Sequence, residues 1–445
     1  MSVQDMTVGS PTKHLLRFAL PLLFGNLFQQ FYNMVDSVVV GRFVGANALA
    51  AVGACGSLGF LFFSLSSGLA LGIGIIVSQY FGAGDEKNVR TMIANSIYVL
   101  LSAVIVVSTV AVVFAPAILH FLRTPDEIIS DSTIYLRITG AGMIFITLYN
   151  GISAILRALG DSKTPLYFLV LSSIVNIILD LVFVVLLNWG VAGVAVATVI
   201  AQTISAIACL VFSIRKISYF RLTKSELKPN WRFVGLAFKL GIPIALQNSL
   251  IAISCVVLQS VVNSFGALAV AAFTITNRIE MLVQQPYGSL GMATSTFSGQ
   301  NIGAHKLERV NQGLARGTLM AFIFSAMMLP IMYVFGHAIC SIFVKDEDVI
   351  AMGMKALRIT SWCYFPLGMI YVPRGLLNGA GDTTFSMING ITEVICRVSL
   401  SLILTKIAFI GIWGIWATNG ATWTLTAIVC VIRYFSGVWK RKGLT

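Results

Sequence analysis

Long runs of apolar residues follow one another along almost the whole chain, and short polar segments separate them. A helix needs about 20 residues to cross a hydrocarbon core of about 30 Å, and the runs have roughly this length. Because the apolar residues are continuous instead of alternating with polar ones, the pattern predicts helices and excludes a closed barrel. Twelve spans are predicted, at 15–38, 52–80, 92–115, 132–156, 165–188, 191–214, 236–262, 270–298, 313–335, 355–377, 385–408 and 411–434.

The two halves of the chain repeat each other at a constant offset of 221 residues. The matched pairs include Gly45 with Gly266, Gln79 with Gln300, Asp161 with Asp382 and Gly190 with Gly411, and Pro21 matches Pro243 after a shift of one residue. Agreement of this kind over separate regions indicates a duplicated unit. Since each copy has six helices, an even number, both copies enter the membrane in the same direction.

The duplication predicts the fold class. We expect an all-α integral membrane protein with twelve transmembrane helices in two parallel six-helix lobes, related by a pseudo-twofold axis along the membrane normal. The predicted N-lobe spans 1–214, a cytoplasmic basic linker follows at 215–235, and the C-lobe spans 236–445.

Composition and charge agree with a membrane setting. Hydrophobic residues make up 57% of the chain and charged residues 11%, which excludes a soluble protein of this length. The net charge of +13 would suggest nucleic acid as a partner of a soluble protein, but here most Lys and Arg fall on one side of the predicted membrane. The positive-inside rule therefore places both termini in the cytoplasm, and we predict the plasma membrane, in a bacterium the inner membrane, without a nucleic-acid partner.

The densest basic cluster lies in the predicted linker. It consists of Arg215, Lys216, Arg221, Lys224, Lys228 and Arg232. Topology alone explains this cluster, and binding of anionic lipid is the alternative.

The architecture also predicts a class of function. Rocking of two parallel lobes can open the interface between them to each side of the membrane in turn, as in transporters. We see no nucleophile with a base, no metal-ligand cluster and no phosphate loop, so we predict a protein that is not an enzyme and that uses no cofactor besides a coupling ion. Uphill transport is then secondary. The expected partners are a small-molecule substrate and the lipid bilayer, and the chain is expected to function as a monomer.

Intramembrane carboxylates distinguish the first lobe from the second. Asp36 and Asp180 lie in apolar runs, whereas the residues at the matching offset are Val257 and Ser401. Asn176 lies one helical turn before Asp180, on the same face. At about 1.5 Å per residue, Asp180 lies roughly 22 Å from the cytoplasmic start of its helix, in the outer half of the membrane.

Asp36, Asn176, Asp180 and Thr198 are therefore predicted to line one cavity in the outer half of the membrane. Two carboxylates with an amide and a hydroxyl can bind a proton or coordinate a small hard cation such as Na⁺ through oxygen atoms. The alternative for Asp36 is a hydrogen-bonding role near the membrane interface, since Arg42 follows within two turns.

The second lobe offers weaker candidates. Glu393 and Arg397 are four residues apart on one predicted helix and are expected to neutralise each other. Arg278 and Glu280 point to different faces of their helix, and either of them could reach a central cavity. Amide and basic side chains that are candidates for a substrate cavity are Gln29, Asn33, Asn150, Arg278 and Gln284. Contacts between helices are the alternative role for such amides.

Five segments resemble the multidrug and toxic compound extrusion (MATE) family, and the resemblance covers essentially the whole chain. They are FYNMVDSVVVGRFVGANALAAVG at 31–53, SQYFGAGD at 78–85, ILRALGDSKTP at 155–165, VNIILDLVF at 175–183 and PRGLLNGAGDT at 373–383. The resemblance implies two lobes of six helices and export of organic cations and other amphipathic compounds in exchange for protons or sodium ions.

The resemblance also suggests roles for individual residues. Asp36, Asn176, Asp180 and Thr198 match the N-lobe cation site of the DinF-like and MepA-like branches. Pro21 stands at the family's kink position in the first helix, where protonation of the nearby aspartate is proposed to drive bending.

The sequence departs from the family's NorM-like pattern in the second lobe. That pattern has a glutamate eight residues after the proline of helix seven, where this chain has Ile251. We therefore expect ion coupling to rest on the N-lobe alone. A flippase for lipid-linked oligosaccharides or other lipids is the alternative function, and it would be expected to show a strongly cationic cavity. The sequence leaves the substrate and the choice between H⁺ and Na⁺ open.

Overall fold

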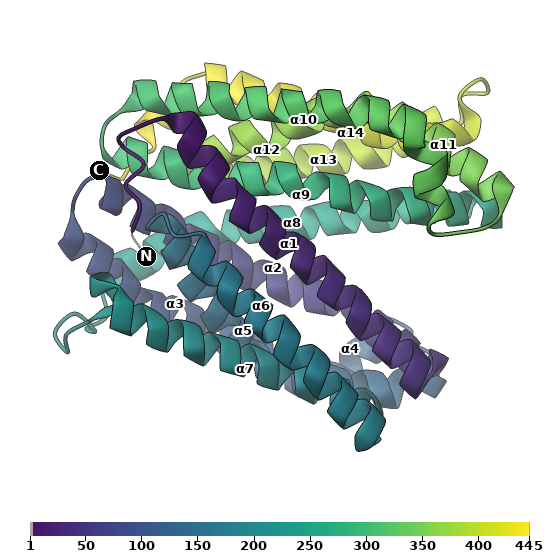
Figure 1. Ribbon diagram of the computed structural model, residues 1–445, viewed down its shortest axis with the longest axis horizontal. Coiled ribbons are helices and arrows are strands. Elements are labelled where there is room, and N and C mark those ends of the chain that lie inside the picture. Colours follow the sequence, from purple (N-terminus) through teal and green to yellow (C-terminus); the bar gives the residue numbers. More distant parts are fainter. Residues whose placement is uncertain (1–2, 445) are drawn as a thin grey trace. The chain divides into compact units, whose positions relative to one another are not determined.

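The computed structural model describes residues 3–444, and helices make up its regular elements in that range (Figure 1). The first eight α-helices are α1 (Pro11–Val39), α2 (Ala46–Gly82), α3 (Glu86–Val113), α4 (Ala115–Phe121), α5 (Asp126–Ala158), α6 (Lys163–Asp180), α7 (Gly190–Lys216) and α8 (Trp231–Asn263). The others are α9 (Ala267–Gly303), α10 (Leu307–Ser341), α11 (Glu347–Ser361), α12 (Tyr364–Gly379), α13 (Thr383–Leu404) and α14 (Gly414–Phe435). Two π-helical segments, η1 (Val40–Val44) and η2 (Leu181–Leu186), continue α1 and α6.

These helices provide the twelve transmembrane spans that the hydrophobic pattern predicts. Within residues 3–444, nine helices are long and apolar enough to cross a membrane, judged by length and composition alone. The other three spans are α1, α9 and the pair α11 and α12. Polar residues such as Gln29 and Asn33 interrupt the apolar character of α1, and Arg278 and Glu280 do so in α9.

The prediction of one continuous helix at 355–377 is wrong, because two helices, α11 and α12, occupy this stretch. The break lies at Trp362 and Cys363, where the amide of Cys363 donates a tight hydrogen bond of 2.8 Å to the carbonyl of Thr360. Pro366 favours the break, because proline lacks the N–H that a continuous helix needs and fits best in the first turn of a new helix, where it lies here. A similar restart, with Pro116 in its first turn, begins α4.

Contacts divide the described residues into two compact units. The first unit contains 3–5 and 20–245, and the second contains 6–19 and 246–444. The chain passes between the units inside α1 and α8, in each case within three residues of a proline, Pro21 or Pro243. The lobe boundaries drawn from the sequence repeat, 1–214 and 236–445, stay a prediction.

Small residues allow close helix packing in the second unit. A Cβ atom on Gly375 of α12 would overlap the carbonyl oxygen of Gly291 on α9, and one on Gly379 would overlap that of Ser295. In membranes, where burial of apolar surface gives helices little drive to associate, such close approach is a main source of helix packing energy.

Substituting Gly375 by Ala is therefore expected to destabilise the second unit by about 1–3 kcal/mol, the usual cost of overpacking. The melting temperature in detergent measures the effect. Gly235→Ala on α8 is the matched control, because a Cβ there meets no atom within 4 Å. Equal melting temperatures for both variants would contradict the role of close packing at Gly375.

The segment between α7 and α8 is folded against the end of α3. Arg90 of α3 forms an ion pair with Glu226, with 2.5 Å between Nε and Oε1, and also donates to the carbonyl of Ser218 at 3.0 Å. Tyr98 donates to the carbonyl of Leu227 at 2.6 Å, and Asn95 accepts from the amide of Asn230 at 2.7 Å. The predicted linker thus has a defined conformation in the first unit.

This attachment is expected to depend on pH. The hydrogen bond from Arg90 and those from Thr223 lower the pKa of Glu226 from 4.5 to about 2. Because the pKa is lowered on folding, the stabilisation is complete above pH 4.5 and is lost as the pH falls toward 2.

We expect hydrogen exchange of residues 221–230 to accelerate between pH 5 and pH 2, after correction for the intrinsic pH dependence of exchange. In Glu226→Gln, exchange should be fast throughout and the extra acceleration should disappear. An acceleration that persists in the variant would show that another group controls the linker.

Candidate functional site

Two aspartates from different helices meet inside the first unit. Asp36 lies in the last turn of α1, and Asp180 is the last residue of α6. Their carboxyl groups lie close enough to influence each other electrostatically. Two ionised carboxylates at close range repel each other, so a proton or a cation between them would offset this repulsion.

Several oxygen atoms around the aspartates are buried and lack a hydrogen-bond partner in the described part of the chain. They are Oδ1 of Asp36, both carboxylate oxygens of Asp180 and Oδ1 of Asn176. The Asp180 side chain is fully buried, with 0% exposure. Burying such groups without partners costs free energy, and a bound proton or cation removes that cost. Oxygen atoms without hydrogen-bond partners are the ligands that a hard cation requires.

Polar neighbours on α7 and α1 complete this site. The amide nitrogen of Asn176 donates to the hydroxyl of Thr198 at 3.3 Å. Tyr32, which lies one turn before Asp36 on α1, is close to Thr198 and to both aspartates. Tyr135 of α5 lies near both aspartates. Because the hydrogen bond to Thr198 uses the side-chain nitrogen of Asn176, the side-chain oxygen of Asn176 is left to act as a ligand in the site.

An apolar layer adjoins the aspartates. The segment η1 begins four residues after Asp36, and η2 begins directly after Asp180. The two segments contact each other, and their valines form a buried cluster with α2 and α7. Its buried members are Val39, Val40, Ala48, Val184, Val191 and Val194. Such π-helical turns occur often at functional sites, because they shift the direction of side chains relative to an α-helix.

The structure thus brings together the four residues predicted for ion coupling, Asp36, Asn176, Asp180 and Thr198. Their role in coupling stays a prediction. Tyr32 is missing from the predicted set, although its spacing of four residues from Asp36 places both on one face of α1. Pro21 lies inside α1, which continues as a helix from Pro11 to Val39.

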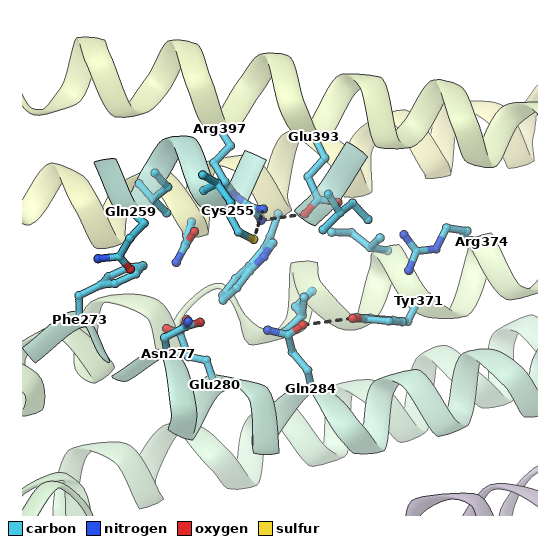
Figure 2. Close-up of a pocket in the computed structure, with 17 residues that line it drawn as sticks. Cys255, Gln259, Phe273, Asn277, Glu280, Gln284, Tyr371, Arg374, Glu393 and Arg397 are labelled. Atoms are coloured by element: carbon cyan, nitrogen blue, oxygen red, sulfur yellow. Dashed lines mark hydrogen bonds and ion pairs between the residues drawn. The ribbon is translucent and has the colours of Figure 1, made fainter. Parts of the chain in front are cut away.

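The second unit contains a cavity of about 290 Å³, which Figure 2 shows. Helix α9 contributes Asn277, Glu280 and Gln284 from one side, and α13 contributes Glu393 and Arg397 from the opposite side. The rest of the wall combines apolar and aromatic side chains, among them Phe273, Leu367, Ile370 and Trp423, with further polar ones such as Gln259, Arg374 and Asn419. A pocket with aromatic faces and several polar groups suits an organic molecule that itself carries charge or polar groups.

Charges in this cavity are only partly paired. Arg397 forms an ion pair with Glu393 at 2.7 Å and donates to Ser254 at 2.7 Å and to the sulfur of Cys255 at 3.2 Å. Glu280 is 3% exposed, and its Oε1 lacks a hydrogen-bond partner among the described residues. The ion pair confirms the neutralisation expected from the spacing, and Glu280 is left as an acid in the cavity wall without an ion-pair partner among the described residues.

The far end of the cavity is built around Tyr371 of α12. Its hydroxyl donates to Oε1 of Gln284 at 3.1 Å (Figure 2). The guanidinium of Arg374 lies 4.9 Å from the centroid of the same ring, a cation–π contact. Ile251, which stands where the NorM-like pattern has a glutamate, lines the cavity as well. The cavity therefore receives its unpaired carboxylate from α9 and not from α8.

The residues predicted for a substrate cavity are divided between the units. Gln284 lines the cavity in the second unit, whereas Arg278 is exposed and is not part of its wall. Gln29, Asn33 and Asn150 belong to the first unit, where the amide nitrogen of Asn150 is buried without a partner among the described residues. A common cavity for this set stays a prediction.

Comparisons with known proteins agree with the fold. The family model described as MatE matches residues 21–182 and again 243–403. The chain is 31% identical over 447 residues to the probable multidrug resistance protein YpnP of Bacillus subtilis, covering 100% of this chain and 99% of that protein. It is 29% identical to the probable multidrug resistance protein YoeA of the same organism, covering 99% of this chain and 97% of that protein.

Solved structures with the same fold include a MOP superfamily transporter from Pyrococcus furiosus. Its TM-score is 0.91 at 23% identity, and the match covers 98% of each chain. The match supports the two-lobe, twelve-helix architecture of this chain.

Proposed function

Since this chain belongs to the MatE family, we propose that it is a secondary antiporter, which exports organic cations and other amphipathic small molecules by alternating access in exchange for H⁺ or Na⁺. The relatives named as multidrug resistance proteins support the drug-export part of this proposal.

The close approach of Asp36 and Asp180, whose buried oxygens lack hydrogen-bond partners among the described residues, is the observation that carries the coupling part. Two buried carboxylates without cationic partners among the described residues need a proton or a metal cation to offset their charge. Such a group exchanges its ion whenever the site opens to water on one side of the membrane. The oxygen ligands of Asp36, Asn176, Asp180 and Thr198 fit Na⁺ as well as H⁺.

The cavity in the second unit supports an organic cation as substrate. Glu280 supplies an unpaired negative charge, and Phe273, Tyr371 and Trp423 supply aromatic faces. A cation is attracted by both features, since aromatic rings carry negative charge on their faces. The volume of about 290 Å³ suits part or all of a small drug.

The same cavity argues against the flippase alternative. A flippase for pyrophosphate-linked lipids would need an excess of positive charge in its cavity. Among the described residues that line this cavity, two guanidinium groups (Arg374 and Arg397) and two carboxylates (Glu280 and Glu393) are equal in number, so the wall carries no excess of positive charge, although only Arg397 and Glu393 form an ion pair.

We further propose the setting in which the antiporter works. The chain is a multi-pass membrane protein, and the positive-inside rule supports cytoplasmic termini. We propose that it lies in the plasma membrane, in a bacterium the inner membrane, functions as a monomer, acts as a transporter and not as an enzyme, and uses no cofactor besides the coupling ion.

Everted membrane vesicles that contain the protein test the proposed function. A fluorescent organic cation is offered while a pH gradient and a Na⁺ gradient are imposed separately. We expect one of the two gradients to drive uptake, and dissipation of that gradient with an ionophore to stop it. Uptake that responds to neither gradient would contradict antiport.

A further inference from the structure

A shallow apolar groove runs between α6 and α7 on the surface of the first unit. Its volume is about 660 Å³, and its wall includes Phe168 of α6 and Ile204, Ile207, Val211 and Phe212 of α7. Phe168 and Phe212 pack edge to face with 5.7 Å between ring centroids, which fixes one wall of the groove. The groove is therefore a formed feature of two packed helices.

Two cationic side chains lie at one end of this groove. Arg215 and Lys216, in the last turn of α7, belong to its wall and are exposed. The carbonyls at this end of α7 are already satisfied, because Arg221 donates to those of Ile214 at 3.2 Å and Arg215 at 2.7 Å. Within residues 3–444, the side chains of Arg215 and Lys216 have no partner, so both charges are available to a ligand.

The position of these charges relative to the bilayer identifies the ligand class. Helix α7 (Gly190–Lys216) is a membrane span, so its last residues reach the level of the lipid headgroups. The apolar part of the groove then lies in the hydrocarbon region. A molecule that fits both parts has an anionic head and an alkyl chain, and basic pockets between transmembrane helices bind such lipids.

We propose that this groove is a binding site for one anionic phospholipid, with its phosphate on Arg215 and Lys216 and an acyl chain between α6 and α7. This site is separate from the aspartate site and from the cavity of the second unit. An anionic lipid is favoured over phosphatidylcholine, whose own ammonium group neutralises its phosphate.

Native mass spectrometry of the full-length protein in detergent tests the headgroup part. The probes are dioleoyl-phosphatidylglycerol and dioleoyl-phosphatidylcholine. We expect the double variant Arg215→Gln/Lys216→Gln to bind phosphatidylglycerol about 30-fold more weakly, as follows from two surface cations at the usual energy per charge. The matched control is Lys224→Gln/Lys228→Gln, which removes two exposed charges of the linker that do not line the groove.

Shorter probes separate the acyl-chain part from simple phosphate binding. Dihexanoyl-phosphatidylglycerol should bind more weakly than the dioleoyl lipid, and glycerol phosphate should not compete. Ala208→Trp, which fills the groove, should weaken binding of the dioleoyl lipid while Arg215 and Lys216 remain.

Three results would overturn the site. They are equal binding of both dioleoyl lipids, equal loss of binding in the control and test double variants, and competition by glycerol phosphate at the affinity of the lipid. The charge variants alter exposed residues, so this test does not depend on folding of Ala208→Trp.

Discussion

Asp180→Asn is expected to reduce ion-driven efflux to the background of vesicles without the protein. Asparagine has nearly the shape of aspartate but neither binds a proton at physiological pH nor contributes a negative charge to a cation site. Since Asp180 is fully buried and its oxygens lack partners among the described residues, the neutral side chain should be tolerated. Uptake of a fluorescent cation in everted vesicles under the driving gradient measures the effect.

Folding is monitored separately, by the melting temperature of purified protein. We expect Asp180→Asn to melt at or above the temperature of the unmodified chain, because the substitution removes an uncompensated buried charge. Asp36→Asn should lose efflux in the same way. The matched control is Asp126→Asn, an exposed acid in the first turn of α5. Full gradient-driven efflux in a folded Asp180→Asn protein would disprove the coupling assignment.

Glu280→Gln is expected to weaken binding of an organic cation by about 30-fold or more, the loss usually seen when one partner of a buried charge pair is truncated. The amide keeps the size and polarity of the side chain but removes the unpaired negative charge. Fluorescence titration of the purified protein with the cation measures affinity without any ion gradient. The Asp180 variant thus tests ion-driven efflux in the first unit, and the Glu280 variant tests cation binding in the second.

Cys255 offers an independent readout of the same cavity. Its thiol lines the cavity and is exposed, so a maleimide should react with it. Bound cation should protect Cys255 in the unmodified chain and fail to do so in Glu280→Gln at the same concentration. The maleimide labelling that is lost in Cys255→Ser is the part that belongs to this residue. Equal protection with and without the Glu280 carboxylate would show that this acid does not hold the substrate.

Helix α9 illustrates what local patterns cannot decide. Arg278 and Glu280 are two residues apart, and the sequence alone shows that they point to different faces. Which face is buried depends on the helices packed against α9. In the structure Arg278 is exposed, whereas Glu280 faces a cavity formed with α8, α12, α13 and α14. The predicted cavity set therefore included Arg278 and left Glu280 out.

The aspartate site shows the opposite case. A carboxylate in an apolar run is costly unless it serves a function, so the sequence alone is enough to single out Asp36 and Asp180. The spacing of Asn176 and Asp180 places both on one helix face. That Asp36 and Asp180 lie close together, and that Tyr32 and Thr198 lie beside them, follows only from the tertiary structure, which brings the end of α1 near α6 and α7.

The sequence by itself determined the twelve spans and the duplication, because a bilayer requires long apolar helices and a repeat survives as residue matches at a fixed offset. It also determined which acids lie within the membrane. Only the tertiary structure decided which acid faces the second cavity and which polar atoms lack partners. These features depend on contacts between segments far apart in the chain, and no local pattern of residues encodes such contacts.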